Sequence, residues 1–101
     1  KPIKELDYSE LRDLLKNKVI LLSSHALDHL NIGERKVYIE RELIDIIDRE
    51  KPRKMYLQEN SRYALYYRKS DGYRKIILDF KNEKAIIVSF MDTPEIPHIG
   101  L

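Results

Sequence analysis

Apolar side chains recur at two different spacings in the two halves of the chain. In residues 7–17 three leucines recur at i, i+3 and i+4, and Asp7 and Glu10 have the spacing of a capping box. In residues 39–50 isoleucine and leucine form one stripe among charged residues, and Pro52 ends the pattern. Both segments are predicted to be amphipathic helices, and the second has the clearer period.

A shorter helix is predicted between these two. Residues 19–23 are apolar and are expected to form either a strand or a buried link. Ser24 then offers an N-cap for a helix over residues 25–31, which Gly33 would close.

Beyond Pro52 the period changes from 3.6 to 2, and β-branched and aromatic residues dominate. The alternation predicts four strands, which cover residues 53–59, 62–69, 73–80 and 84–91. Asp71-Gly72 is typical of a two-residue hairpin turn. Such a turn would place Tyr67 opposite Ile76 on an apolar face, and Arg68 opposite Lys75 on the other face.

The turn near Asn82-Glu83 leaves two registers open for the last strand. An odd number of loop residues would extend the apolar face with Ile86, Val88 and Phe90, which is the register we prefer. A two-residue turn would instead extend it with Ala85, Ile87 and Ser89.

Helices followed by a meandering sheet predict an α+β fold: two or three N-terminal helices packed on one face of a roughly four-stranded antiparallel sheet. The length of 101 residues predicts a single domain, 1–101. Its parts are a mainly helical region, 7–50, an antiparallel sheet, 53–91, and an extended, loosely attached tail, 92–101.

Charge is unevenly distributed along the chain. The total is only +2, yet residues 51–91 hold ten basic and four acidic side chains together with five of the seven tyrosines. The sheet face without helices is expected to display alternating cations and rings: Lys54, Tyr56, Gln58, Arg62, Tyr66, Arg68, Tyr73 and Lys75. Cations neutralise phosphates and rings stack on unpaired bases, so this face predicts binding of single-stranded nucleic acid. The alternative is a solvated sheet face that merely carries charges and β-forming residues.

His25 and His29 lie four residues apart, so a helix would place both on one side. We considered half of a metal site, a general base held by Asp28, and an ordinary surface or capping role. No metal site and no cofactor are predicted, because a third ligand and the Glu that follows the first His in metalloprotease helices are missing. His98 in the tail is interpreted as incidental.

Several short motifs resemble a known family in order and content. The segment 22–29, which contains Ser23-Ser24-His25-Ala26, the segments 38–44 and 62–68, and a terminal hydrophobic strand are similar to a group of small uncharacterised domains that open with Ser/Thr-x-His-Ala. These His-Ala-motif domains are related to BrnT-like toxins of the RelE/barnase-like superfamily. At the position one helical turn after His25, where the family has Arg, this chain has His29.

The resemblance implies an open sheet face that handles RNA and, in toxin members, a metal-independent ribonuclease paired with an antitoxin protein. By this hypothesis His25 is the base or acid, Arg62, Arg68 and Lys75 hold the phosphate, and Tyr66 stacks or donates a proton. Lys54, Tyr56, Tyr73 and Lys75 would complete the RNA-binding surface.

Two alternatives to a ribonuclease stay open. The same face could bind nucleic acid without catalysis, or an exposed strand, such as the one that ends at Met91, could pair with another protein or a second copy. The absence of Cys and of a secretion signal makes the cytoplasm the expected compartment, and no apolar run approaches the roughly 18 residues of a membrane span. The single Gln and the many Lys, Glu, Ile and Tyr residues are typical of proteins from hot environments.

Overall fold

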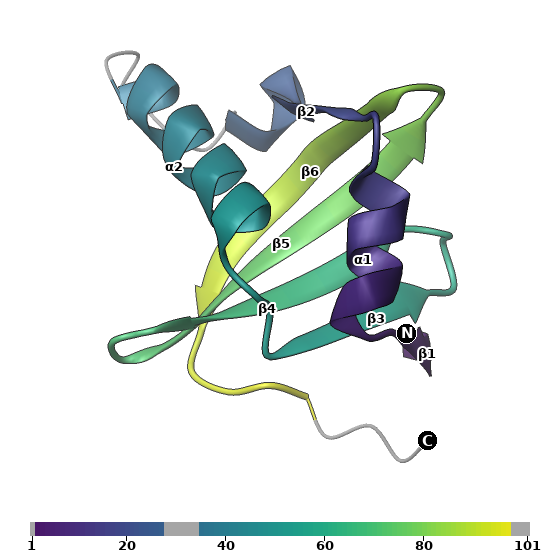
Figure 1. The fold of residues 1–101 in the computed structure, drawn as a ribbon. Coiled ribbons are helices and arrows are strands. Elements are labelled where there is room, and N and C mark those ends of the chain that lie inside the picture. The colour runs from purple at the N-terminus through teal and green to yellow at the C-terminus, as the bar shows by residue number, and fades with distance from the viewer. Residues whose placement is uncertain (1, 28–34, 98–101) are drawn as a thin grey trace.

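The computed structural model describes residues 2–27 and 35–97. In chain order the elements are β1 (Pro2–Glu5), α1 (Tyr8–Leu15), β2 (Val19–Leu22), the 3-10 helix η1 (Ser24–Leu27), α2 (Arg35–Arg49), β3 (Lys54–Gln58), β4 (Tyr63–Lys69), β5 (Gly72–Lys81) and β6 (Lys84–Thr93). Figure 1 shows α1 and α2 on the same side of one twisted sheet. We call this covered side the inner face and the opposite side the outer face.

The sheet corrects the predicted fold class. It has six strands in the order β1-β3-β4-β5-β6-β2, and β2 runs parallel to β6, whereas the sequence predicted about four antiparallel strands. Strand β1 was missed because four residues that include a proline and two charges show no apolar alternation. The segment 19–23 was left open as a strand or a link, because its partner strand lies more than sixty residues away in the sequence.

The helical predictions fare better. Asp7 caps α1 and forms the predicted capping box with Glu10. The helix over residues 39–50 is confirmed as α2, although α2 begins earlier, at Arg35. Where a helix over residues 25–31 was expected, Ser24–Leu27 form a 3-10 helix, and the rest of that prediction lies outside the described residues.

One side chain of α1 hydrogen-bonds to the C-terminal end of α2. The Arg12 guanidinium of α1 donates to the backbone carbonyls of Ile47 and Asp48 at the end of α2. The last carbonyls of a helix have no partner within it, so this bond both caps α2 and joins the helices. Beneath them lies the main core on the inner face, which comprises Leu11, Leu43, Ile47, Met55, Leu65, Tyr67, Ile76, Leu78 and Ile87.

The β4–β5 hairpin differs from the predicted register by two residues. Its turn is Ser70-Asp71, and Gly72 already pairs with Lys69. Gly72 has φ +144°, and a Cβ there would lie 2.7 Å from the carbonyl oxygen of Thr93. The glycine is therefore needed where β5 passes the end of β6, not within the turn. A shift of two residues keeps every side chain on its expected face but changes its cross-strand partner.

Strand β6 begins in the register that we had not preferred, and a bulge then changes which of its side chains face the core. Lys81 pairs with Lys84 across a two-residue turn, so Ala85 and Ile87 face the core. The register then shifts between Ile77 and Leu78, where β6 has one extra residue, Val88. Phe90 consequently returns to the inner face, opposite Ile76.

Candidate functional site

The candidate site is the outer face, and the structure places the predicted cations and rings there. Cross-strand pairs join Lys54 to Tyr66, Tyr66 to Lys75, and Arg68 to Tyr73. Tyr56 lies beside Ala64 in the next row, and Arg62, just before β4, approaches Asp79 of β5. His25 is the one predicted catalytic residue that does not belong to this group.

Two of the tyrosines are covered. Tyr56 and Tyr66 meet edge to face with ring centroids 6.1 Å apart, and each is only 3% exposed. Ile77 of β5 and Ile96 of the C-terminal segment pack against them. The expectation of a loosely attached tail is therefore wrong for Ile96, because the chain after β6 runs back beneath the sheet towards β3 (Figure 1).

Burial also changes the chemistry of these two phenols. Desolvation raises the pKa of Tyr66, and it is the main reason why the pKa of Tyr56 is raised as well. Tyr66 thus holds its proton more tightly than a free phenol. This environment opposes the role of proton donor that the resemblance implied.

The predicted pairing of Arg68 with Lys75 does not occur, because the register places a tyrosine opposite each of them. The Arg68 guanidinium carbon lies 5.3 Å from the centroid of the Tyr73 ring, and Lys75 Nζ lies 5.7 Å from that of Tyr66. Cation–π contacts of this kind hold a charged group in place while its donors stay available for a ligand. Among the described residues neither cation has a carboxylate within 4 Å.

Neighbouring cations are already paired with acids. On the same strands, but on the inner side, Lys69 Nζ lies 2.6 Å from a carboxylate oxygen of Asp92. Arg74 contacts Asp92 at 2.7 Å and Glu42 at 3.5 Å. The hydrogen bond from Lys69, supported by Arg74, holds the pKa of Asp92 below its usual range.

The margins of the outer face are also partly neutralised. Lys54 Nζ lies 3.0 Å from Glu5, whose hydrogen bond and charge raise the pKa of Lys54, and Arg62 Nε lies 3.8 Å from Asp79. The Glu5 contact was missed because β1 was missed. Asp79 could have been found, because alternation along β5 places it on the same face as Tyr73 and Lys75.

His25 lies at the far edge of the sheet. It belongs to η1, which follows β2, and its backbone N–H donates to Ser23 Oγ. Strands β5 and β6 separate β2 from β4, so three strand spacings, or about 14 Å, lie between β2 and the strand of Arg68. The structure does not bring His25 together with Arg62, Arg68 and Tyr66. His29 and His98 lie outside the described residues.

A pocket of about 260 Å³ adjoins the outer face. Its walls come from the β4–β5 turn and the start of the C-terminal segment, and they include Tyr73, Asp71 and Pro94. Since Tyr73 lines this pocket and is only partly buried, its ring is the most accessible of the face's tyrosines.

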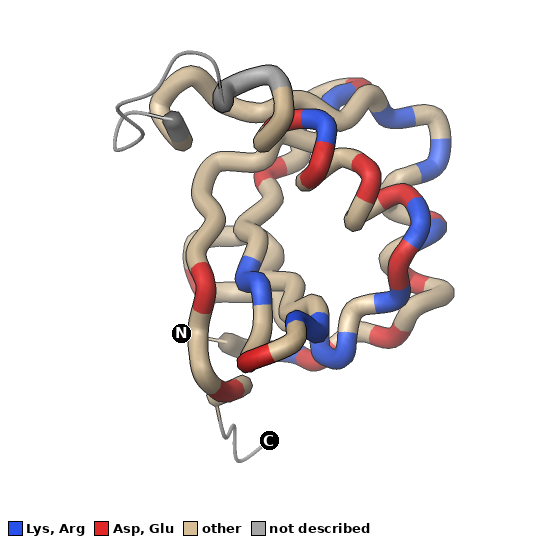
Figure 2. The backbone as a smooth tube through the Cα atoms, turned by 90° about the vertical axis from the view of Figure 1, so that its left-hand side faces the viewer, with Lys and Arg blue, Asp and Glu red and all other residues tan. Residues whose placement is uncertain are grey.

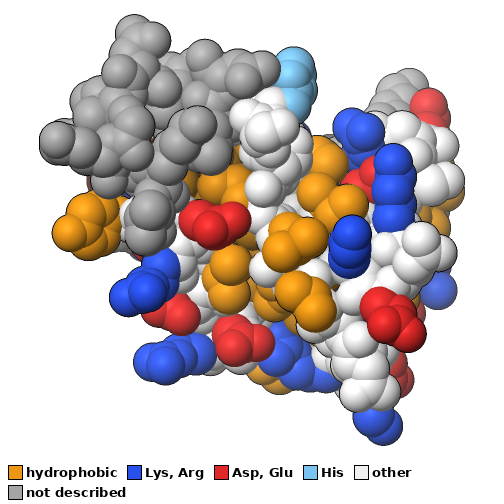
Figure 3. Space-filling view, turned by 90° about the horizontal axis from the view of Figure 1, so that it is seen from above, with side chains coloured by type: hydrophobic (Ala, Val, Ile, Leu, Met, Phe, Trp, Pro, Cys, Tyr) orange, Lys and Arg blue, Asp and Glu red, His pale blue; other side chains and the backbone are white. Residues whose placement is uncertain are grey.

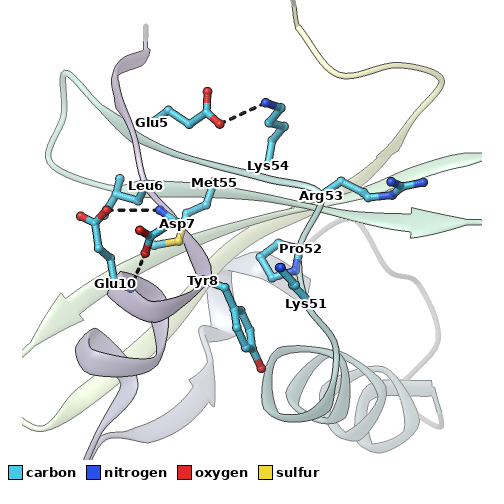
Figure 4. Close-up of a pocket in the computed structure, with 10 residues that line it drawn as sticks. All are labelled: Glu5, Leu6, Asp7, Tyr8, Glu10, Lys51, Pro52, Arg53, Lys54 and Met55. Carbon is cyan, nitrogen blue, oxygen red and sulfur yellow. Dashed lines mark hydrogen bonds and ion pairs between the residues drawn. The ribbon is translucent and has the colours of Figure 1, made fainter.

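A second pocket, of about 390 Å³, lies where α1, β1 and β3 meet (Figure 4). Its acids are occupied: Glu5 binds Lys54, while Asp7 and Glu10 bind each other's backbone N–H. Lys51 lies over the ring of Tyr8, 5.8 Å from its centroid. These interactions account for most of the charged groups of the pocket, so we do not regard it as the functional site.

The helical side offers no comparable excess of positive charge. The sequence of α2 has four acidic and four basic residues. Figure 2 shows both signs of charge interspersed along the chain on this side. Within the described residues, no helix has both the length and the apolar character that crossing a membrane requires.

Comparison of the chain with known protein families, with curated proteins and with solved structures gave no match. The candidate function is therefore judged from the geometry of the outer face alone.

Proposed function

We propose that this protein binds single-stranded RNA through the outer face of its sheet. Arg68 and Lys75 would contact phosphates, Lys54 would add charge at the margin, and a base would stack on Tyr73. One observation carries the proposal: Arg68 and Lys75 have no carboxylate partner among the described residues, whereas Lys69 and Arg74, their neighbours on the same strands, do.

The arrangement of these cations suits a phosphodiester chain. Arg68 and Lys75 are diagonal neighbours on adjacent antiparallel strands, a relation that separates side-chain origins by about 7–8 Å. Both are held over rings, so less side-chain freedom is lost when a phosphate binds. Together with an accessible ring, they provide the two interactions that dominate the binding of single strands.

The proposal does not include cleavage of the RNA. Cleavage by the hypothesis above needs a proton acceptor and a cation at one phosphate, and His25 follows β2, which strands β5 and β6 separate from the strand of Arg68. The kinship with BrnT-like domains, the antitoxin partner and the cytoplasmic location stay predictions from the sequence.

The test compares two double variants with the same change in net charge. Arg68→Gln with Lys75→Gln removes the unpaired cations, while Lys69→Gln with Arg74→Gln removes the paired cations on the opposite face of the same strands. Binding of a labelled 12-nucleotide oligouridine is measured by fluorescence anisotropy in EDTA. We expect the first variant to bind at least tenfold more weakly, a loss of about 1.4 kcal/mol, and the second to bind nearly as well as the unmodified protein.

Equal losses in both variants would mean that only net charge matters, and no loss in either would overturn the proposal. The same mixtures, run on a denaturing gel, report cleavage. A product that disappears on replacing His25 by Gln would assign a ribonuclease instead.

A further inference from the structure

The two edges of the sheet are built differently. Strand β1 carries Pro2, Lys4 and Glu5, and its register is irregular between Pro2 and Lys4. Proline, charge and bulges are the features that keep an edge strand from pairing with another chain. Strand β2, at the other edge, consists of Val-Ile-Leu-Leu and has a regular register with β6. It has no proline, no charge and no irregular pairing, although Glu40 of α2 covers one of its backbone N–H groups.

The free side of β2 presents backbone groups. The N–H groups of Val19 and Ser23 point towards β6 and its turn, where they donate to Glu83 and Ile87. Successive peptide groups of a strand point to opposite sides, so those of Ile20 and Leu22 face outward. The Leu22 N–H bears this out, because its acceptor at 3.3 Å is the side chain of Glu40 on α2.

Apolar side chains accompany these groups. Val19 is 59% exposed and Leu21 is 36% exposed, both beside the outer-face residues of β6. Figure 3 looks down on this end of the molecule, where β2 lies, and shows hydrophobic side chains gathered near its centre, with cations on more than one side of them. The strand that could pair is therefore β2, not the strand ending at Met91, whose first half β2 covers.

We propose that two copies of this chain pair along β2 to form a homodimer. The strands would run antiparallel about a two-fold axis at Leu21, so that two six-stranded sheets join into one. Ile20 and Leu22 of one copy then exchange backbone hydrogen bonds with Leu22 and Ile20 of the other. Leu21 meets its own equivalent on the outer face.

Charge complementarity favours a second copy as the occupant. In this register the start of β2 in one copy, which Lys18 precedes, meets the end of β2 in the other copy, where Glu40 contacts Leu22. Among the described residues Lys18 has no carboxylate oxygen within 4 Å, and Glu40 has no lysine or arginine nitrogen within 4 Å. On pairing, Glu40 releases the Leu22 N–H and meets Lys18 of the other copy. Because of the two-fold symmetry, the same exchange occurs at both ends of the paired strands.

Sedimentation equilibrium over a range of concentrations tests the proposal. Leu21→Lys places like charges opposite each other at the axis and is expected to weaken dimerisation at least tenfold. Met91→Lys changes another exposed apolar side chain away from this edge and should leave the dimer intact. A mass that stays that of the monomer up to millimolar concentration would overturn the proposal, as would a dimer indifferent to Leu21→Lys.

A charge exchange tests the symmetry. Lys18→Glu alone and Glu40→Lys alone each bring like charges together and should weaken the dimer, whereas the two changes combined should restore it. Failure of the combined variant to recover would contradict the two-fold register, provided that it folds.

Hydrogen exchange of the unmodified protein supplies a measurement without substitutions. The Ile20 amide should exchange more slowly as concentration rises, and constant exchange in a dimer would place the interface elsewhere.

Discussion

Ile96 fastens the C-terminal segment over Tyr56 and Tyr66, so replacing it should separate stability from RNA binding. Ile96→Ala deletes apolar groups worth about 2 kcal/mol when fully buried. Because Ile96 is only partly buried, we expect the free energy of unfolding to fall by about 1 kcal/mol. Before RNA bases can stack on the two covered rings as well as on Tyr73, the segment must be displaced at a similar cost. The variant should then bind oligouridine about fivefold more tightly.

Urea denaturation and fluorescence anisotropy on the same preparation measure the two effects. Met91→Ala, an exposed apolar residue on the same face, is the control and should change neither quantity. Lower stability with unchanged affinity would refute the idea that the segment competes with RNA for the rings. Unchanged stability would refute the packing of Ile96 itself.

Three further substitutions test the packing and electrostatics of the fold. Tyr67 is 1% exposed, and its hydroxyl has no hydrogen-bond partner among the described residues. Tyr67→Phe should therefore raise the free energy of unfolding by about 1 kcal/mol. A lower free energy of unfolding in urea denaturation would show that the hydroxyl has a partner. At Gly72, φ is +144° and an added Cβ would approach the Thr93 carbonyl oxygen. Gly72→Ala should therefore destabilise the fold by about 1–3 kcal/mol and lower the melting temperature by several degrees, whereas Ser70→Ala in the turn should not. An unchanged melting temperature in Gly72→Ala would argue against this close approach. The pKa of Asp92 is lowered by Lys69 and Arg74, so its ionised form stabilises the fold above about pH 4, and this contribution is lost as pH falls through the lower folded-state pKa. Because Asp92 is half exposed, the effect should stay below about 1 kcal/mol. Urea denaturation from pH 6 to pH 2 should show this loss of stability, and Asp92→Asn should reduce the dependence of the free energy of unfolding on pH in this range. Identical pH profiles for the two proteins would show that these ion pairs do not stabilise the fold.

The sequence predicted the elements whose signals are local. The capping box at Asp7, the stripe of α2 and the alternation of β3 to β6 depend on neighbouring residues, and all of them appear in the structure. Side-chain faces were also predictable, since the two-residue error in the β4–β5 register preserves parity.

Features that depend on distant residues were not predictable. The parallel pairing of β2 with β6, the bulge at Val88 and the cover that Ile96 provides all join segments far apart in the chain or depend on tertiary packing. The same dependence on tertiary structure limits how much of the site could be predicted from the sequence. Alternation placed Arg68 and Lys75 on the outer face, but only the tertiary structure shows which cations are paired and how far His25 lies from them.

The salt dependence of RNA affinity tests the central claim most directly. Each phosphate contact on a single strand contributes about 0.7 to the slope of log affinity against log salt concentration. The variant that lacks the charges of Arg68 and Lys75 should therefore show a slope shallower by about 1.4 than the unmodified protein, while the variant that lacks those of Lys69 and Arg74 keeps the original slope. Identical slopes for all three proteins would contradict the claim that the outer face binds the phosphates.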